Sequence, residues 1–329
     1  WGHYRHSPAL RACAQAAVRR MLDFACADLP AQAEFVDGVL ERISSEVGPS
    51  LPIERVVFHL RCLQRLMTHP VARQWAVGDG RVASFFQDSV PLVLLAIGDH
   101  FSSSISVLSL LLPIVNRTCW LCVDHWASES ASDEQGETGR RSCLGALQVE
   151  SLVGSIYLRT LKSAAAPLKS VEGAANQALT PKEGAEVLVV LLEGLCDLLR
   201  ADTVRTLWIS FDADWRRPPL LEQVMECIVV LFHDAPSTER PLPAHIVHLI
   251  STVLARIVGA FAAVGAEACQ DEAEVARVKE QWQRREAVLQ FIEKFEESPK
   301  KAKQALDKSG ILDFVPMPPP LAGSVQDPP

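Results

Sequence analysis

Two acidic side chains separated by one alanine, Asp212 and Asp214, are the residues of this sequence best placed to do chemistry. They lie in the stretch LWISFDADWRRPPLLEQVMEC, residues 207–227. Carboxylates at this spacing can bind a divalent metal or a sugar nucleotide, but such a site needs further oxygen ligands and a phosphate cradle. Neither is visible in the sequence. We therefore favour a structural corner that also serves as an interface, and a metal-dependent enzyme is the weakest alternative.

The helices expected on either side of the pair explain why these acids need partners. Apolar residues at helical spacing precede them, with Asp202 as the expected N-cap, and the next helix is expected to begin at Pro218 and Pro219. The acids thus follow a helix C-terminus, where the helix dipole disfavours each of them by about 0.3–1 kcal/mol. We expect compensation from the backbone N–H groups that open the next helix, or from Arg216 and Arg217.

A second candidate for ligand chemistry is the CWLC segment with the histidine after it, which supplies Cys119, Cys122 and His125. These residue types bind zinc, but no fourth ligand is indicated, so core cysteines are favoured. The nine cysteines of the chain are odd in number and dispersed, which predicts reduced, buried cytosolic thiols. The sequence contains no Gly-rich phosphate loop and no arguable nucleophile–base pair. We predict no catalytic residue, no cofactor and no metal.

Composition narrows the class of protein. The chain has 329 residues, 48% hydrophobic and 22% charged, as is ordinary for a soluble folded protein. Its net charge of −8 gives no support for nucleic-acid binding. The apolar run 245–266 is long enough to span a membrane, but His245, His248 and a central Arg256 favour a buried helix. The chain begins with Trp1 and no leader follows, which suggests an internal piece of a longer protein.

Helical periodicity extends over almost the whole chain. In PIERVVFHLRCLQRLM, for example, Val56, Leu60 and Leu63 recur at steps of three and four residues. Helical segments follow one another through short turns without a strict repeat, which predicts an all-α fold, an irregular helical solenoid of armadillo or HEAT type. Breaks are expected at the polar segment 128–142 and the proline-rich segment 234–243. The proline-rich tail is expected to be disordered.

The segment IYLRTL and the stretch LVVLLEGLCDLLRADTVRTLWISFDADWRRPPLLEQVMECIVVL resemble the HUS region of large Arf guanine-nucleotide exchange factors, which belong to the Sec-seven family. The family's HUS box is an Asn-Tyr-Asp-Cys-Asp run ahead of a helix. Here Ser210 stands in place of the asparagine and Phe211 in place of the tyrosine. Asp212 and Asp214 match the two aspartates, with Ala213 between them in place of the cysteine.

A second resemblance lies near the C-terminus, in FEESPKKAKQALDKSGIL, which is similar to the start of the family's catalytic exchange domain. The positions that match are Phe295, Pro299, Lys300, Lys301, Leu306, Gly310 and Leu312. Glu296 and Ala302 depart from the usual asparagine and glycine. The segments 10–22 and 149–158 are also similar to family helices, so that the resemblance covers residues 10–312.

The resemblance divides the chain into five parts. These are the end of a DCB-like dimerisation region at 1–25, a HUS-like helical region at 26–235, linker helices at 236–292, the opening helix of a truncated exchange domain at 293–312, and a disordered tail at 313–329. The family's catalytic glutamate lies in a Phe-Arg-Leu-Pro-Gly-Glu run that this sequence does not contain. The chain is therefore expected to be non-catalytic.

What the resemblance implies is regulation of an exchange factor through protein partners. The family uses these regions for dimerisation, for recruitment to Golgi membranes by activated GTPases, and for restraint of the exchange domain. The expected partners are Arf-family GTPases, with Rab-family GTPases as a further class, and a second copy of the chain. The expected location is the cytoplasm, peripherally on Golgi and trans-Golgi membranes, and the expected interaction residues are Ser210, Phe211, Asp212 and Asp214. The alternative is a related helical trafficking scaffold without exchange activity.

Overall fold

The computed structural model describes most of the chain, and most of the described residues are helical. The described residues are 8–27, 29–48, 50–68, 90–130, 148–169, 179–214, 217–234, 242–268 and 272–298. No strand occurs among them, and the predicted all-α fold is confirmed. The tail at 313–329 and the segment 131–142 lie outside the described residues.

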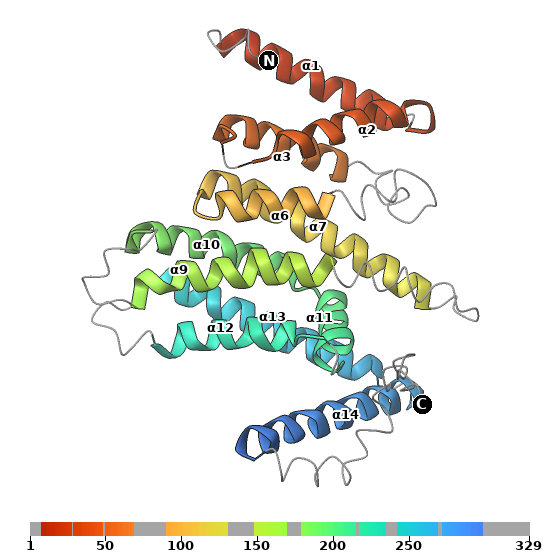
Figure 1. The fold of residues 1–329 in the computed structure, drawn as a ribbon, viewed down its shortest axis with the longest axis vertical. Coiled ribbons are helices and arrows are strands. Elements are labelled where there is room, and N and C mark those ends of the chain that lie inside the picture. The colour runs from red at the N-terminus through yellow and green to blue at the C-terminus, as the bar shows by residue number, and fades with distance from the viewer. Residues whose placement is uncertain are drawn as a thin grey trace, which may run out of the picture.

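The helices stack in successive layers along the long axis of the molecule, with α1 at one end and α14 at the other (Figure 1). The first layers are formed by α1 (Pro8–Ala27), α2 (Leu29–Glu46), α3 (Ile53–Thr68), α6 (Val90–Phe101) and α7 (Ile105–Ser130). The later layers are formed by η3 (Val153–Leu158), α9 (Arg159–Lys169), α10 (Pro181–Leu198), α11 (Ala201–Leu207), η4 (Trp208–Asp212), α12 (Leu220–Asp234), α13 (Ala244–Ala268) and α14 (Glu272–Glu297).

Each layer buries an apolar stripe against the next. Helix α3 packs on α7, α7 packs on α10, and α10 packs on both α9 and α13. In α3 the residues at the predicted spacing, Val56, Leu60 and Leu63, are at most 1% exposed. Burial of such stripes is the main source of stability for helices that are packed in this way.

A buried network of hydrogen bonds connects three of these elements, η3, α7 and α10. Tyr157 of η3 donates its hydroxyl proton to Asn116 Oδ1 of α7 at 2.5 Å. Asn116 in turn donates from Nδ2 to the Gly194 carbonyl of α10 at 2.8 Å. A Cβ atom added to Gly194 would lie 2.9 Å from Leu112 Cδ1 and 2.9 Å from the Tyr157 hydroxyl. Glycine is therefore required where α10 approaches this network.

Two of the described helices are long and apolar enough to cross a membrane, judged by length and composition alone. The two apolar segments are Ile105–Val123, in α7, and Ala244–Ala263, in α13. The share of the apolar window that is buried inside the structure is 56% for the first segment and 28% for the second. Helix α13 covers the run that was expected to be a buried helix. Only one of its faces is buried, whereas Val258 on another face is 67% exposed. Arg256 donates from Nη1 to the Cys196 carbonyl at the end of α10, at 2.5 Å.

Candidate functional site

Asp212 is the side chain around which the corner between η4 and α12 is built. Its Oδ1 accepts a hydrogen bond from the Leu221 amide at 3.0 Å, and its Oδ2 accepts one from the Glu222 amide at 2.9 Å. Helix α12 begins at Leu220, so the carboxylate satisfies N–H groups that have no partner within the helix. Asp212 is only 4% exposed. The expected compensation by the amides of the next helix is thus found for this acid.

Asp214 uses the other kind of partner that the sequence suggested. Its Oδ2 lies 3.7 Å from Arg217 Nε, and both side chains are partly exposed. The Arg217 guanidinium also lies 5.3 Å from the centre of the Phe211 ring. The two acids of the motif therefore have different roles. Asp212 caps a helix from a buried position, and Asp214 pairs with an arginine at the surface.

The expected N-cap of the preceding helix was wrong by two residues. Helix α11 begins at Ala201, its N-cap is Arg200, and Asp202 lies within the first turn. Helix α10 ends at Leu198, and only two residues separate it from α11. Helix α11 therefore begins earlier in the sequence than expected. The Arg200 side chain makes no capping hydrogen bond, and its guanidinium lies 3.3 Å from the centre of the Trp120 ring.

The turn that presents the acids is a π-helix, η4. Its wider spacing is marked by the hydrogen bond from the Ala213 amide to the Trp208 carbonyl, five residues earlier, at 2.9 Å. Phe211, Asp212 and Ala213 are consecutive, and all three are buried. Among the four residues expected to interact, Phe211 and Asp212 thus face the core, whereas Ser210 and Asp214 are partly exposed.

Arg285 of α14 closes the corner and was missed by the sequence analysis. It donates from Nη1 to the Asp212 carbonyl oxygen and from Nη2 to Glu222 Oε2, the latter at 2.7 Å. The residue is 8% exposed. One guanidinium thereby holds both ends of the corner, the last residue of η4 and the first turn of α12. We call Asp212, Glu222 and Arg285 the corner clamp.

A signal for Arg285 is present in the apolar residues of its own helix. Val278 and Trp282 precede it by seven and three residues, which places all three side chains on one helix face. Trp282 packs near Trp208 of η4, with ring centres 6.5 Å apart, and Trp208 makes an edge-to-face contact with Phe261 of α13. A charged residue within an apolar stripe indicates a buried partner.

The remainder of this apolar face of α14 is not covered by the described part of the chain. Leu289 is 53% exposed and Ile292 is 45% exposed. Phe295, the first of the residues that resemble the start of an exchange domain, is 52% exposed. The others at that site, Pro299, Lys300, Lys301 and Gly310, lie outside the described residues.

Burial sets the charge behaviour of the corner. It raises the pKa of the Asp212 carboxyl to about 6, although the hydrogen bonds from the Leu221 and Glu222 amides and the nearby Arg285 act to lower it. At neutral pH the carboxyl is therefore ionised, and both oxygens act as acceptors. Both oxygens already accept hydrogen bonds from those amides and the residue is buried, so the geometry favours a structural role.

Cys119 and Cys122 also have the properties of core residues. Burial raises the pKa of the Cys119 thiol well above its ordinary value and that of Cys122 to about 12, which disfavours the thiolate that binds zinc. The His125 side chain lies outside the described residues. No group of three metal-ligating side chains is found in the described part of the chain. One expectation was wrong: Cys13, in the outermost helix α1, is exposed rather than buried.

Comparison with known proteins gives no assignment. No protein-family model, no curated protein and no solved structure matches this chain. Any function must therefore be inferred from the residues and their geometry, chiefly those of the corner clamp.

Proposed function

We propose that this chain is the non-catalytic regulatory part of a large Arf guanine-nucleotide exchange factor and acts by binding protein partners. The observation that carries the proposal is the corner clamp. Arg285 joins Asp212, in the stretch that resembles the HUS box, to α14. That helix leads into the residues that resemble the start of the exchange domain. The hydrogen bonds of Arg285 thus connect two stretches with family resemblance that are far apart in sequence.

The clamp gives a physical route for such regulation. Asp212 fixes the start of α12, and the same residue's carbonyl accepts from Arg285, so that movement of α14 breaks hydrogen bonds at the corner. A partner that binds the stack and shifts this corner would change the position of α14, and with it the position of whatever follows the helix. Buried hydrogen bonds to charged groups are worth about 1.5–3 kcal/mol each, which is in the range of allosteric coupling energies.

The finer assignments form part of the same proposal. The helical stack is an irregular solenoid of armadillo or HEAT type, which offers extended faces to partners. The HUS-like region covers 26–235, and the linker region covers 236–292. The chain forms a homodimer, binds activated Arf-family GTPases, with Rab-family GTPases as a further class, and is held peripherally at Golgi membranes from the cytoplasm.

Partner capture tests this proposal directly. The purified chain is presented to Arf loaded with a non-hydrolysable GTP analogue or with GDP, and retention of the GTP-analogue form alone is expected. Ser210→Arg alters the half-exposed edge of the corner and is expected to weaken capture about tenfold, while circular dichroism stays unchanged. Asp202→Arg, an exposed change in the neighbouring helix, is the matched control. Equal capture of both nucleotide forms, or of neither, would contradict the proposal.

The alternative function is that of a trafficking scaffold without exchange activity. It is favoured by the residues that depart from the family pattern, Ser210, Ala213, Glu296 and Ala302. The two candidates differ in what a longer product of the same gene does. Under the first, a product that extends beyond residue 329 and carries a Phe-Arg-Leu-Pro-Gly-Glu run catalyses nucleotide exchange on Arf. Under the second, it binds partners and leaves the exchange rate unchanged.

A further inference from the structure

A groove of about 650 Å³ lies between α1 and α3, in the N-terminal layers of the stack and away from the corner clamp (Figure 1). Its volume is within the range of about 300–1,000 Å³ that is usual for sites that bind small molecules. All but one of the described lining residues are polar, so a ligand must be recognised by charge and hydrogen bonds. They are Arg19 and Asp23 of α1, and Arg61, Gln64, Arg65 and Thr68 of α3. We call this the α1–α3 groove.

The two helices that form this groove are more basic than the chain as a whole. Together α1 and α3 contain six arginines and two acidic residues, which gives the pair a net charge of +4. The whole chain has a net charge of −8. Three of the six arginines line the groove, and Asp23 is the one acid among the described lining residues. This concentration of positive charge favours an anionic ligand.

Asp23 neutralises only one of these three arginines. Arg65 binds both oxygens of the Asp23 carboxylate, since it donates from Nε to Oδ1 and from Nη2 to Oδ2, the latter at 3.0 Å. Two parallel hydrogen bonds of this kind are typical of strong pairs between arginine and a carboxylate. The positive charges of Arg19 and Arg61 remain in the groove.

Arg19 and Arg61 make no ion pair with any residue that the structure describes. Arg19 donates from Nε to the Gln15 carbonyl at 3.3 Å, a bond that does not use its two terminal nitrogens. Burial raises the pKa of the Cys62 thiol to about 11, and the charge of Arg19 opposes this effect. Because Cys62 directly follows Arg61 in α3, the Arg19 charge acts on the same part of α3 that carries Arg61.

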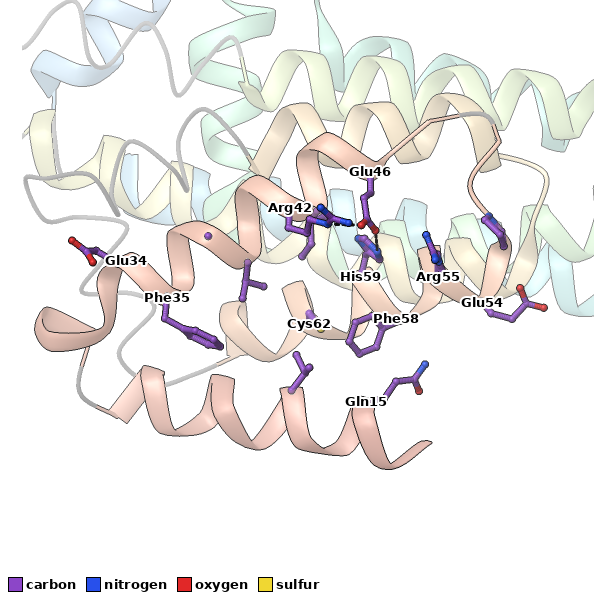
Figure 2. Close-up of a pocket in the computed structure, with 15 residues that line it drawn as sticks. Gln15, Glu34, Phe35, Arg42, Glu46, Glu54, Arg55, Phe58, His59 and Cys62 are labelled. Atoms are coloured by element: carbon purple, nitrogen blue, oxygen red, sulfur yellow. Dashed lines mark hydrogen bonds and ion pairs between the residues drawn. The ribbon is translucent and has the colours of Figure 1, made fainter. Parts of the chain in front are cut away.

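A second cavity beside the same two helices, of about 680 Å³, has no such excess of positive charge (Figure 2). Helix α2 forms its third side. Arg42 in that cavity is paired with Glu46 at 2.5 Å. The charged residues of its lining are Arg42, Arg55, Glu34, Glu46 and Glu54, so that acids outnumber arginines. An anion is therefore favoured in the α1–α3 groove and not in this cavity.

A phosphomonoester matches the two remaining guanidiniums in charge and in shape. At pH 8 its phosphate carries about two negative charges and has three acceptor oxygens on one phosphorus atom. A planar guanidinium binds two oxygens of such a group at once, so one phosphate offers enough oxygens for both Arg19 and Arg61. A sulfate ester or a single carboxylate has one negative charge and leaves the second guanidinium without a counter-charge.

We propose that the α1–α3 groove binds a phosphomonoester, whose phosphate accepts hydrogen bonds from Arg19 and Arg61. The pair of Asp23 with Arg65 holds α1 and α3 together beside the bound phosphate. The site is separate from the corner clamp and does not depend on the proposed regulatory function.

Three small aromatic anions test the proposal on the full chain in ligand-detected NMR titrations at pH 8 and low ionic strength. Phenyl phosphate is a dianion with its charge on one group, phenyl sulfate is a monoanion of nearly equal shape, and phthalate is a dianion with its charge on two carboxylates. We expect phenyl phosphate to bind about tenfold more tightly than either of the others. Equal affinity for phenyl phosphate and phenyl sulfate, or for phenyl phosphate and phthalate, would overturn the proposal.

Three variants with the same loss of charge locate the site. Arg19→Gln and Arg61→Gln each remove one guanidinium from the groove and are each expected to weaken binding of phenyl phosphate about tenfold. Arg20→Gln removes the same charge from an exposed position of α1 outside the groove lining, and is expected to change the affinity less than about twofold. Equal losses in all three variants would contradict the site, because the anion would then respond to net charge alone. Helix content by circular dichroism verifies folding, and the ligand comparison on the unaltered chain stands if a variant does not fold.

A phosphomonoester can belong to a soluble molecule or to a lipid headgroup, and vesicles distinguish these two sources. Phosphatidic acid presents a phosphomonoester at the membrane surface, whereas phosphatidylserine presents a phosphodiester, and the vesicles are prepared with equal surface charge. Sedimentation of the chain with phosphatidic acid vesicles alone, lost in Arg19→Gln and Arg61→Gln, would assign the site to a lipid headgroup. Binding of phenyl phosphate without sedimentation would assign it to a soluble phosphomonoester. The absence of binding to both phenyl phosphate and phosphatidic acid would overturn the proposal.

Discussion

The corner clamp and helix α3 each contain a titratable side chain that is almost fully buried, Asp212 at 4% exposed and His59 at 5%. They differ in how the polar atoms are used. Both carboxylate oxygens of Asp212 accept backbone hydrogen bonds, whereas His59 Nδ1 has no partner among the described residues. Asp212 fixes the geometry of two helices, whereas His59 Nδ1 is a buried polar atom whose cost of burial no hydrogen bond from the described residues offsets. Burial alone therefore does not show whether the polar atoms of a side chain are satisfied.

The largest effect is expected from removing the satisfied group. Asp212→Ala leaves two buried amides without an acceptor and is expected to lower the free energy of unfolding by about 2–4 kcal/mol in urea denaturation at pH 7. Asp214→Ala is the matched control, because its pair with Arg217 is partly exposed, and is expected to cost at most about 0.5–1 kcal/mol. Equal losses for the two variants would remove the distinction between the acids.

The next largest effect is a dependence of the free energy of unfolding on pH, which arises from the Asp212 carboxyl. Its pKa is raised from 3.8 to about 6, so the folded state keeps a proton that the unfolded state has released in this range. The stabilisation from that proton is complete below pH 3.8 and is lost as the pH rises through about 6. The raised pKa corresponds to at most about 3 kcal/mol in the free energy of unfolding.

Asp212→Asn provides the baseline for this measurement, because asparagine does not titrate. The unfolding free energy of the unaltered chain, minus that of the variant, should fall between pH 4.5 and pH 7. A difference that stays constant over this range would show that the carboxyl has the same pKa in both states.

A smaller loss of stability is expected from a change at Arg285, which attaches α14 to the corner. Arg285→Ala removes the hydrogen bonds to the Asp212 carbonyl and to Glu222. It is expected to lower the free energy of unfolding by about 1.5–3 kcal/mol, mostly from the bond to the buried carbonyl, because Glu222 is itself about half exposed. Hydrogen exchange should accelerate in α14 and in the first turn of α12. Arg284→Ala, one residue away in a pair with Glu280, is the control. Equal exchange in both variants would contradict a specific clamp.

The smallest effect is a gain in stability, which is expected from a change at Gly38 in α2. Gly38→Ala is expected to raise the free energy of unfolding by about 0.5–1 kcal/mol, since the added methyl group meets no neighbour and alanine favours the helix. Gly194→Ala is the matched contrast. Its methyl group would lie 2.9 Å from Leu112 Cδ1, and such overpacking costs about 1–3 kcal/mol. The two changes of unfolding midpoint should therefore differ in sign.

Local features of the site were largely predictable from sequence. The corner was placed between two helices, and the amides of the second helix were named among the partners of its acids. Capping and pairing act over a few residues, so spacing indicates them well. The predicted N-cap Asp202 failed because the end of α10, rather than residue preference, determined where α11 begins.

The sequence by itself determined the helices, their apolar faces and the identity of the two acids, because these depend on interactions between near neighbours in the chain. Tertiary structure alone decided that Asp212 is buried, that Arg285 reaches it across 73 residues, and that His59 Nδ1 has no hydrogen-bond partner in the described part of the chain. It also decided that the turn at Asp212 is π-helical. Hydrogen bonds across the stack depend on how whole layers are placed, and no local spacing records that placement.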